Sequence, residues 1–547
     1  MIKIKKLIKK FWFELIFLTI AFAFSWWLMW QTFDYRDGSF YIAAKAWSDF
    51  SANIPLIRSF SWGNNFPPEY PLFPGEPIQY HFLFYLMVGL LEKAGLPINW
   101  ALNLPSIAGF TALLIIIYLF AKLLFNKRIV AFLAITFFLF NGSFSFLEFF
   151  RQHPLSLNTP HEIITNQVFP SFGPYDGKIV SAFWNLNIFT NQRHLAPAYF
   201  LVLLGVYILV RHVKLEKKLK LWQLVFLGTI VGVLPFFHKV AFIITWVVFV
   251  SFFFYFSKLR RPIFTILAIS ALLALPQLAY QLRGGVPSIS WHPGYLIFPP
   301  LTISKFISYW SLNLSLSLIF IPIGFILANK LAQKLFLAFF PLFIIGNLFQ
   351  FSPEIAANHK FFNLFLIVGN IFSAWAIFQL WEKSLLTKLV VPFSIFLLTF
   401  SGIIDFFPIK NDSAYAIVDA PENQDILWIK ENAPPEAVFL NSSYLYHPAS
   451  LAGRKIFLGW PYFPWSAGYD TNRREVTRKQ VLGASTTNKK TICDILRLNN
   501  IKFVSLEKNS PGNFTPNFSF WQNNFIEIYN NPRSGLTIYD VAKSCPL

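Results

Sequence analysis

The sequence has few charged residues, and acids are especially scarce. Only 13% of its 547 residues are charged, and 26 Asp and Glu stand against 46 Lys and Arg. Hydrophobic residues make up 55% of the chain, and the mean hydropathy is +0.50. This composition excludes an ordinary soluble enzyme and indicates a polytopic membrane protein. The net charge of +20 could suit nucleic acid, but the basic residues form short clusters beside apolar segments. We therefore expect no nucleic-acid partner.

Cysteine is nearly absent. The two cysteines, Cys493 and Cys545, both lie in the polar C-terminal part. No histidine spacing around either one suits a metal site, so we expect no cysteine-bound metal. In an exported domain the pair could form a disulfide or stay as free thiols, and the sequence leaves both readings open. We expect no cofactor, although a divalent metal at the active face is not excluded.

Eleven apolar segments are long enough to be read as helices crossing a hydrocarbon core of roughly 30 Å. The predicted spans are 11–31, 105–125, 129–147, 196–210, 221–237, 240–257, 263–280, 311–328, 335–351, 361–381 and 388–404. The first resembles a signal peptide, but it is long and no small-x-small site follows it, so we expect an uncleaved anchor. There is no internal repeat and no matched pair of broken helices, which secondary transporters often show.

The basic residues between these spans fall on one side of the membrane. Alternate connections hold 20 Lys and Arg but only two acids, Glu216 and Glu382. This positive-inside bias predicts a multi-pass protein of the cytoplasmic membrane, with a cytoplasmic N-terminus and an extracytoplasmic C-terminal part. The opposite, extracytoplasmic face receives nearly all residues capable of chemistry.

One further apolar stretch, 80–95, would invert this topology if it crossed the membrane. It is short and carries polar residues at both ends, so we expect an interfacial helix on the outer leaflet. The first outer loop then covers 32–104, with turn chemistry at Asp37-Gly38 that suits a small hairpin. The second outer loop covers 148–195.

The composition changes at Asp405, after the last predicted span. The fold class we predict is a polytopic α-helical membrane domain, residues 1–404, followed by an extracytoplasmic α/β domain, residues 405–547. In the second domain we expect helices and strands to alternate. The expected helices are 423–432 and 491–499, and the expected strands are 437–441, 455–458, 503–506 and 536–541.

Several cations lie at the outer ends of the predicted spans, on the side where the bias depletes them. Arg193, His194, Lys239 and Lys360 are the candidates for binding a lipid-linked phosphate. The alternative is that they are interfacial anchors, since long basic side chains extend toward water at span ends.

A sugar transfer would also require a carboxylate that accepts the acceptor's proton. Asp49 precedes the apolar run 50–60, and its alternative role is to cap the helix predicted there. Asp34 and Asp37 are the reserves, with a glycine-containing turn as their alternative role. Glu69, His81 and Asn358 complete the candidates, as loop residues near the acceptor.

The arrangement of a basic N-terminus, one span and a long outer loop with an acid resembles the GT-C membrane glycosyltransferases. The span from Leu104-Pro-Ser-Ile-Ala-Gly, which ends in Asn126-Lys-Arg, carries the same resemblance. Further motifs are similar to bacterial polytopic members related to the protein O-mannosyltransferases and aminoarabinose transferases. These are Gly75-Glu-Pro-Ile-Gln-Tyr-His-Phe, Asn191-Gln-Arg-His-Leu, Asn358-His-Lys-Phe-Phe-Asn, Trp428-Ile-Lys-Glu-Asn and Gly459-Trp-Pro.

The resemblance implies an inverting glycosyltransferase that uses a polyprenyl-phosphate sugar donor and a first-loop acid as base. The acceptor would be a glycan, lipid or protein of the cell envelope. Two departures leave the base and the acceptor class open: no Asp-Glu pair directly follows the first span, and no Trp-Trp-Asp motif occurs in the tail. The alternatives are a transporter or flippase of lipid-linked saccharides and a non-catalytic envelope assembly protein. Transport would favour charged residues deep in several spans, and the predicted spans contain few.

Overall fold

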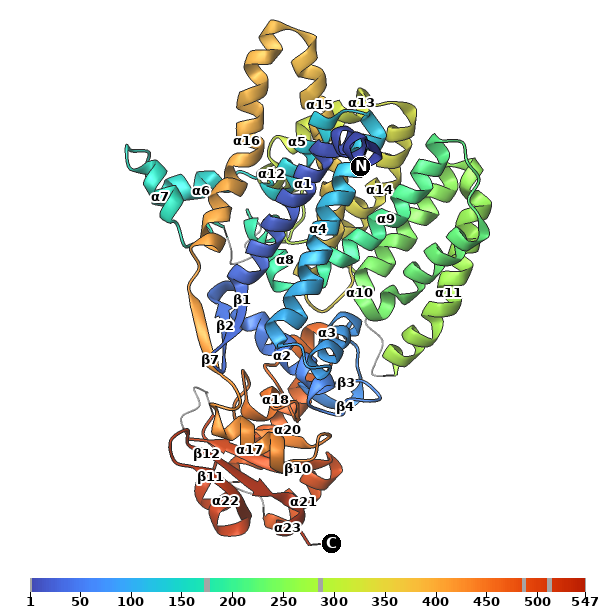
Figure 1. Cartoon of the computed structure of the whole chain (residues 1–547). Coiled ribbons are helices and arrows are strands. Elements are labelled where there is room, and N and C mark those ends of the chain that lie inside the picture. The colour runs from blue at the N-terminus through green and yellow to red at the C-terminus, as the bar shows by residue number, and fades with distance from the viewer. Residues whose placement is uncertain (1, 172–177, 284–288, 485–487, 509–513, 547) are drawn as a thin grey trace. The chain divides into compact units, whose positions relative to one another are not determined.

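A computed structural model describes the chain except for residues 1, 172–177, 284–288, 485–487, 509–513 and 547 (Figure 1). The chain forms two compact units, and each contains segments that are distant in sequence. The helical unit comprises Met1–Thr32, Asn103–Pro276 and Ile289–Ser413, and the mixed unit comprises Phe33–Leu102, Gln277–Ser288 and Ala414–Leu547. This division differs from the predicted one at residue 405, because the first outer loop groups with the C-terminal part.

The helical unit contains long apolar helices and several short ones. They are α1 (Ile2–Thr32), α4 (Ile98–Phe125, whose first turn belongs to the mixed unit), α5 (Arg128–Leu139), α6 (Ser145–Gln152), α7 (Thr159–Thr165), α8 (Asn187–Asn191), α9 (Leu195–Lys214), α10 (Leu221–Tyr255), α11 (Arg260–Leu282), α12 (Ile303–Leu314), α13 (Ser317–Ile326), α14 (Lys330–Leu348), α15 (His359–Lys383) and α16 (Leu385–Lys410). The strands β5 (Ser290–Trp291) and β6 (Phe349–Gln350) pair antiparallel.

The number of spans needs correction. Among the described residues, eight helices are long and apolar enough to cross a membrane, or nine if the pair α12 and α13, bent by 87°, is one span. Eleven spans were predicted, and three departures account for the difference. The predicted spans 221–237 and 240–257 are two helical segments that meet at His238 and are counted once, as α10. The segment 311–328 is the bent pair, and the segment 129–147 is helical for only 12 residues in α5.

The break inside α10 lies where the sequence predicted a tight turn. His238 has a non-helical backbone, with φ −166° and ψ 96°, and Pro235 precedes it. Proline removes one helical hydrogen bond and crowds the preceding turn, which favours a kink at this point. Two helical segments therefore meet at His238 without a connecting loop.

The centre of the bundle is α15, which packs against α5, α13, α14 and α16. Most of its residues are buried, from His359 to Ala374 without interruption. At Gly324 of α13, a Cβ atom would lie 2.0 Å from the carbonyl oxygen of Phe372, so the two backbones approach as only glycine permits. Close packing of this kind is how helices associate in lipid, where apolar burial from water gives no driving force.

The mixed unit contains a five-stranded sheet with the order β11-β12-β10-β8-β9. These strands are β8 (Val438–Asn441), β9 (Lys455–Ile456), β10 (Ile501–Glu507), β11 (Ile526–Asn531) and β12 (Leu536–Asp540). Strand β8 pairs parallel with β9 and with β10. Strand β12 pairs antiparallel with β10 and with β11. The accompanying helices are α17 (Gln424–Asn432), α18 (Pro448–Leu451), α19 (Tyr462–Ala467), α20 (Thr471–Gly483), α21 (Lys489–Leu498), α22 (Phe518–Asn524) and α23 (Val541–Ser544).

The first outer loop contributes two hairpins and two helices to this unit. Strands β1 (Phe33–Arg36) and β2 (Ser39–Ala43) form the predicted hairpin, and β7 (Ala414–Val418) from the C-terminal part pairs with β2. Helix α2 (Trp47–Ser61) packs on α3 (Leu83–Lys93), and β3 (Glu69–Tyr70) pairs with β4 (Phe73–Pro77). Helix α3 has 11 residues, too few to cross a membrane, so the prediction that 80–95 is not a span is confirmed.

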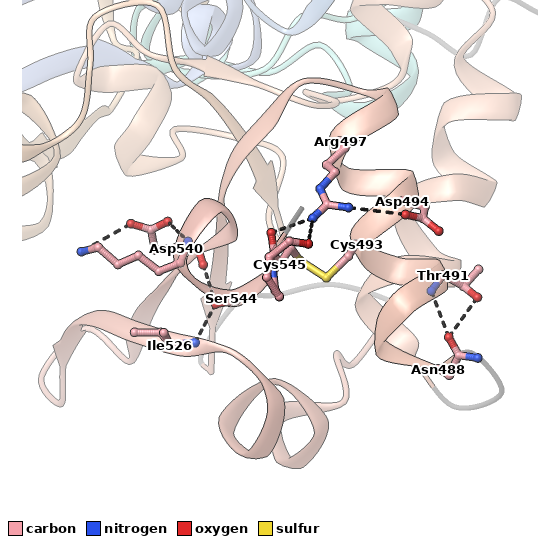
Figure 2. Close-up of a disulfide and its surroundings, with 11 residues drawn as sticks. Asn488, Thr491, Cys493, Asp494, Arg497, Ile526, Asp540, Ser544 and Cys545 are labelled. Atoms are coloured by element: carbon pink, nitrogen blue, oxygen red, sulfur yellow. Dashed lines mark hydrogen bonds and ion pairs between the residues drawn. A yellow bond between two sulfur atoms is a disulfide. The ribbon is translucent and has the colours of Figure 1, made fainter.

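The two cysteines form a disulfide, which resolves the question that the sequence left open (Figure 2). Cys493 lies on α21, and Cys545 follows α23, 52 positions later. Arg497 donates to the carbonyl oxygens of Cys545 and Pro546 and lies 3.6 Å from the carboxylate of Asp494. The bond therefore holds the end of the chain against α21.

The disulfide is expected to stabilise the mixed unit. Closing a loop of 52 residues should contribute about 4 kcal/mol through the unfolded chain. Cys545→Ser should therefore lower the melting temperature of this unit in purified protein, and a reductant should reproduce the shift in the wild type. An unchanged melting curve in both cases would show that the bond contributes nothing to stability.

Candidate functional site

The helical unit brings together basic side chains from three helix ends. His194 immediately precedes α9, His238 lies at the break in α10, and His359 and Lys360 begin α15. The rings of His194 and His238 are 5.2 Å apart. Lys360 is near enough to interact electrostatically with all three histidines. The sequence predicted His194 and Lys360 as partners, and the structure places them in one cluster.

Two members of this cluster were not among the predicted site residues. They are His238, which lies between the predicted spans 221–237 and 240–257, and His359, which precedes the predicted span 361–381. His359 is fixed by its neighbours, because its ring stacks on Phe183 at 4.9 Å. With the Asn363 amide turned to match its surroundings, Oδ1 of Asn363 accepts from Nδ1 of His359 at 3.3 Å. The sequence feature that could have indicated these two histidines is that a histidine stands at the end of several apolar segments.

The side chain of Arg193 forms hydrogen bonds with the C-terminal end of α1. Its guanidinium donates to the carbonyl oxygen of Met29 at 3.1 Å, to Oγ1 of Thr32 at 2.6 Å and to Oδ1 of Asn103 at 3.4 Å. It is fully buried. These bonds fix the start of α9 against α1 and α4, so Arg193 has a positioning role that the sequence did not reveal.

Two other predicted residues of the helical unit lie close to the cluster in sequence. Lys239 follows the break at His238 and is half-buried. Asn358 is buried and donates to the carbonyl oxygens of Gly346 at 2.9 Å and Phe349 at 2.6 Å. These bonds satisfy carbonyl groups at the end of α14, which accounts for Asn358 structurally.

Asp34 and Asp37 lie in the β1–β2 hairpin of the mixed unit. Asp37 is exposed and has a positive φ of 51°, followed by Gly38 at 66°. Asp-Gly is a preferred pair for such two-residue turns, so the turn role accounts for Asp37. Asp34 accepts from Nδ2 of Asn99 at 3.0 Å and from the backbone of Tyr35 at 2.8 Å.

Asp49 lies in the first turn of α2, and the helix begins three residues earlier than predicted. The N-cap position belongs to Ala46, so Asp49 is not the cap residue. An acid in the first turn still interacts favourably with the helix dipole. Asp49 therefore lies inside the helix and does not cap it.

The charge of Asp49 acts on four tyrosines of the same unit. Burial raises the pKa of Tyr70, Tyr80, Tyr85 and Tyr446, and the charge of Asp49 contributes to each increase. Tyr446 also donates to the carbonyl oxygen of Trp47, and the two rings are 5.0 Å apart. The phenols stay protonated, and the single hydroxyl hydrogen of Tyr446 goes to that carbonyl oxygen.

Glu69 and His81 lie on the same segment as Tyr70 and Tyr80. Glu69 pairs with Nζ of Lys455 at 2.6 Å, which connects β3 to β9 of the large sheet. The ring of His81 stacks on Tyr80 with centroids 3.9 Å apart. Glu69 therefore has a structural partner, and His81 lies next to the tyrosines around Asp49.

The mixed unit also contains a buried ion cluster that the sequence did not predict. Arg58 of α2 lies 2.8 Å from Glu92 of α3 and 2.8 Å from Asp419, which follows β7. All three side chains are almost fully buried. Burial raises the pKa of Glu92, while the Arg58 guanidinium lowers it. The guanidinium also lies 3.3 Å from the ring centroid of Trp62.

Comparison with known proteins gives a likeness of fold. No family model and no curated protein sequence matches the chain. The oligosaccharyltransferase of Archaeoglobus fulgidus in its apo form is similar in structure, with a TM-score of 0.54 and 12% sequence identity. The alignment covers 98% of this chain and 76% of that chain. A second structure of that enzyme, tethered with an acceptor peptide, gives a TM-score of 0.42 at 11% identity over 99% and 75% of the two chains, too low to support an argument.

The chain is therefore a multi-pass membrane protein with a C-terminal mixed α/β region and a fold like that of the Archaeoglobus fulgidus oligosaccharyltransferase. At this level of identity the likeness concerns the fold, and the chemistry has to be argued from the residues.

Proposed function

We propose that the protein transfers a sugar, with inversion, from a polyprenyl-phosphate donor to an acceptor of the cell envelope. The observation that carries this proposal is the cluster of Lys360 with His194, His238 and His359 at the ends of apolar helices, in a fold like that of an oligosaccharyltransferase. The distribution of Lys and Arg supports a cytoplasmic membrane location with the active face outside.

In this proposal the helical unit binds the carrier phosphate. A cation at the boundary between apolar helices and water suits a group that is charged at one end and isoprenoid at the other. Lys360 and His194 would contact the phosphate, with Lys239 nearby. Arg193 remains a candidate ligand and also positions the start of α9 through its bonds to α1.

The mixed unit would supply the base. Asp49 would take the proton from the acceptor's attacking group while that group forms a bond to the anomeric carbon. The bond between that carbon and the phosphate oxygen breaks, and polyprenyl phosphate leaves with the electron pair. The tyrosine hydroxyls around Asp49 would orient an acceptor, and Asp34 and Asp37 remain reserves for the base. The acceptor would be a glycan, lipid or protein.

The rival proposal is transport of a lipid-linked saccharide without chemistry. Polar groups do occur inside the bundle: Asn141, Asn185, Asn363 and Asn370 line a cavity among aromatic rings. Asp405 also lies buried inside α16, beyond the predicted end of that span, with Asn185 and Ser181 beside it. However, the cavity holds about 20 Å³, enough for a water molecule and far too little for a saccharide. Charged residues deep in several spans would favour transport, and the predicted spans contain few, so the enzyme proposal is favoured.

Lys360→Ala should weaken donor use by about ten- to a hundredfold, because a charge-assisted contact to phosphate contributes roughly 1.5–3 kcal/mol. The bond from the Tyr199 hydroxyl to the backbone carbonyl of Lys360 remains in this variant. Turnover at limiting donor concentration measures the effect.

Lys410→Ala is the matched control, because Lys410 is an exposed lysine at a helix end of the same unit. It should keep wild-type turnover. Equal turnover of Lys360→Ala and the wild type at limiting donor would show that Lys360 is only an anchor.

A further inference from the structure

A protruding arm of the helical unit exposes several large apolar side chains. The arm comprises α6, α7 and the residues up to 168, and Figure 1 shows it to one side of α16. Leu155 is 81% exposed and Leu157 is 102% exposed. Leu147, Ile164 and Val168 are exposed as well. An exposed apolar group of this size marks a surface that something covers.

The depth of the arm in the membrane can be inferred from the point where α5 ends and the arm begins. Helix α5 ends after 12 residues, about 18 Å of helix, which reaches only partway across a bilayer. The chain then runs in non-helical form against α16. A Cβ atom at Gly142 would lie 2.4 Å from the carbonyl oxygen of Leu398, and one at Gly402 would lie 2.3 Å from the carbonyl carbon of Phe140. Irregular backbone at membrane depth is tolerated where protein covers it in this way.

Helix α6 continues this contact along α16. The backbone N–H of Phe146 donates to Oγ of Ser401, and the ring of Phe146 lies 5.7 Å from that of Phe400. Phe400 is ten residues before the end of α16 at Lys410, so it lies about 15 Å from that end along the axis. The arm therefore begins inside the thickness that α16 crosses.

The far end of the arm is held at the end of the same helix. Nδ2 of Asn411 donates to the carbonyl oxygens of Ile164 at 2.7 Å and Asn166 at 3.0 Å. The segment between these two attachments spans the C-terminal part of α16. Helix α16 also exposes large apolar side chains, including Leu389 and Phe393, as a lipid-facing helix does.

Polar groups on the arm suit the boundary between acyl chains and headgroups. Arg151 pairs with Glu148 at 2.9 Å, and both stand on α6 beside the exposed Leu147. A segment that combines an apolar face with a charged face lies in the interface plane of a membrane.

We propose that the arm is a membrane-embedded element of the leaflet that surrounds the C-terminal part of α16. Leu147, Leu155 and Leu157 lie among the acyl chains, and the charged pair lies at the headgroups. The arm widens the contact between the protein and that leaflet. This inference rests on packing and exposure, and it holds whether or not the protein transfers a sugar.

A single fluorophore tests the proposal. Cys493 and Cys545 are bonded to each other, so Leu157→Cys introduces the one thiol that an environment-sensitive nitrobenzoxadiazole label can modify. The full chain is reconstituted in phosphatidylcholine vesicles with and without lipids brominated near the headgroup end of the acyl chains. We expect blue-shifted emission that the brominated lipids quench.

Val476→Cys is the matched control, since Val476 is an apolar residue on α20 with 66% exposure. Its label should emit as in water and should be quenched by aqueous iodide. If the label on Leu157→Cys behaves like the label on this control, the proposal is wrong. Blue-shifted emission from the label at position 157 that the brominated lipids do not quench would also contradict the proposal, because protein and not lipid then covers the arm. If that signal varies with the protein-to-lipid ratio, the cover is a second copy of the chain.

Discussion

Asp49→Asn should lower the rate of sugar transfer by about 10²–10⁴-fold, the usual contribution of a general base. The amide has the shape of the carboxylate but cannot take the acceptor's proton at neutral pH. The loss of charge in the first turn of α2 should cost only about 0.3–1 kcal/mol through the helix dipole. The protein should therefore remain folded, and donor turnover in the presence of acceptor measures the loss.

The comparison with the two reserve acids is fair because their asparagine variants should also preserve local structure. Asparagine tolerates the positive φ of Asp37, and its amide oxygen can still accept the bond from Asn99 that Asp34 accepts. Glu527→Gln, at an exposed position on β11, should keep full activity. Near-normal transfer by Asp49→Asn, with loss in Asp34→Asn or Asp37→Asn, would move the base to the hairpin.

Arg58→Ala should destabilise the mixed unit by about 3–5 kcal/mol, because it leaves Glu92 and Asp419 buried without their common partner. The loss should appear as a lower melting temperature and faster proteolysis of this unit. Arg473→Ala removes an exposed arginine of the same unit and should change neither.

A charge-neutral combination separates the ion cluster from simple packing. In Arg58→Met combined with Glu92→Gln and Asp419→Asn, no buried charge is left, so much of the stability should return. If the triple variant is as unstable as Arg58→Ala, the effect arises from the packing of Arg58 on Trp62. A stable Arg58→Ala would contradict the assignment of the cluster as a structural centre.

Much of the fold could be predicted from local patterns. The hairpin at Asp37-Gly38, the helix within 80–95, the helix at 423–432 and the strand at 536–541 all correspond to observed elements. Each depends on turn residues or on the period of apolar residues, and these are properties of neighbours in sequence.

What the patterns missed depends on distant contacts. The first outer loop joins the C-terminal part through the pairing of β2 with β7 and through Arg58 and Asp419, 361 positions apart. The short α5 was predicted as a full span because the apolar run continues past Leu139, while the backbone contacts at Gly142 and Gly402 end the helix. Such contacts leave no local signal.

The candidate site divides in the same way. Lys360 and His194 were predicted because cations are rare at the outer ends of spans, and that argument needs no structure. His238 and His359 could be assigned to the same cluster only once the structure had brought the three helix ends together. Asp49 was selected as the start of a helix, but the tyrosines around it come from positions 70 to 85 and from 446.

The central claim is that the protein breaks the bond between a sugar and a polyprenyl phosphate. Purified protein in lipid nanodiscs, supplied with a panel of polyprenyl-phosphate sugars and cell-envelope acceptors, tests it directly. We predict consumption of at least one donor with release of polyprenyl phosphate, and loss of this activity in Asp49→Asn. Movement of lipid-linked saccharide across liposomes containing the protein, with every donor of the panel left intact, would contradict the claim and favour a transporter.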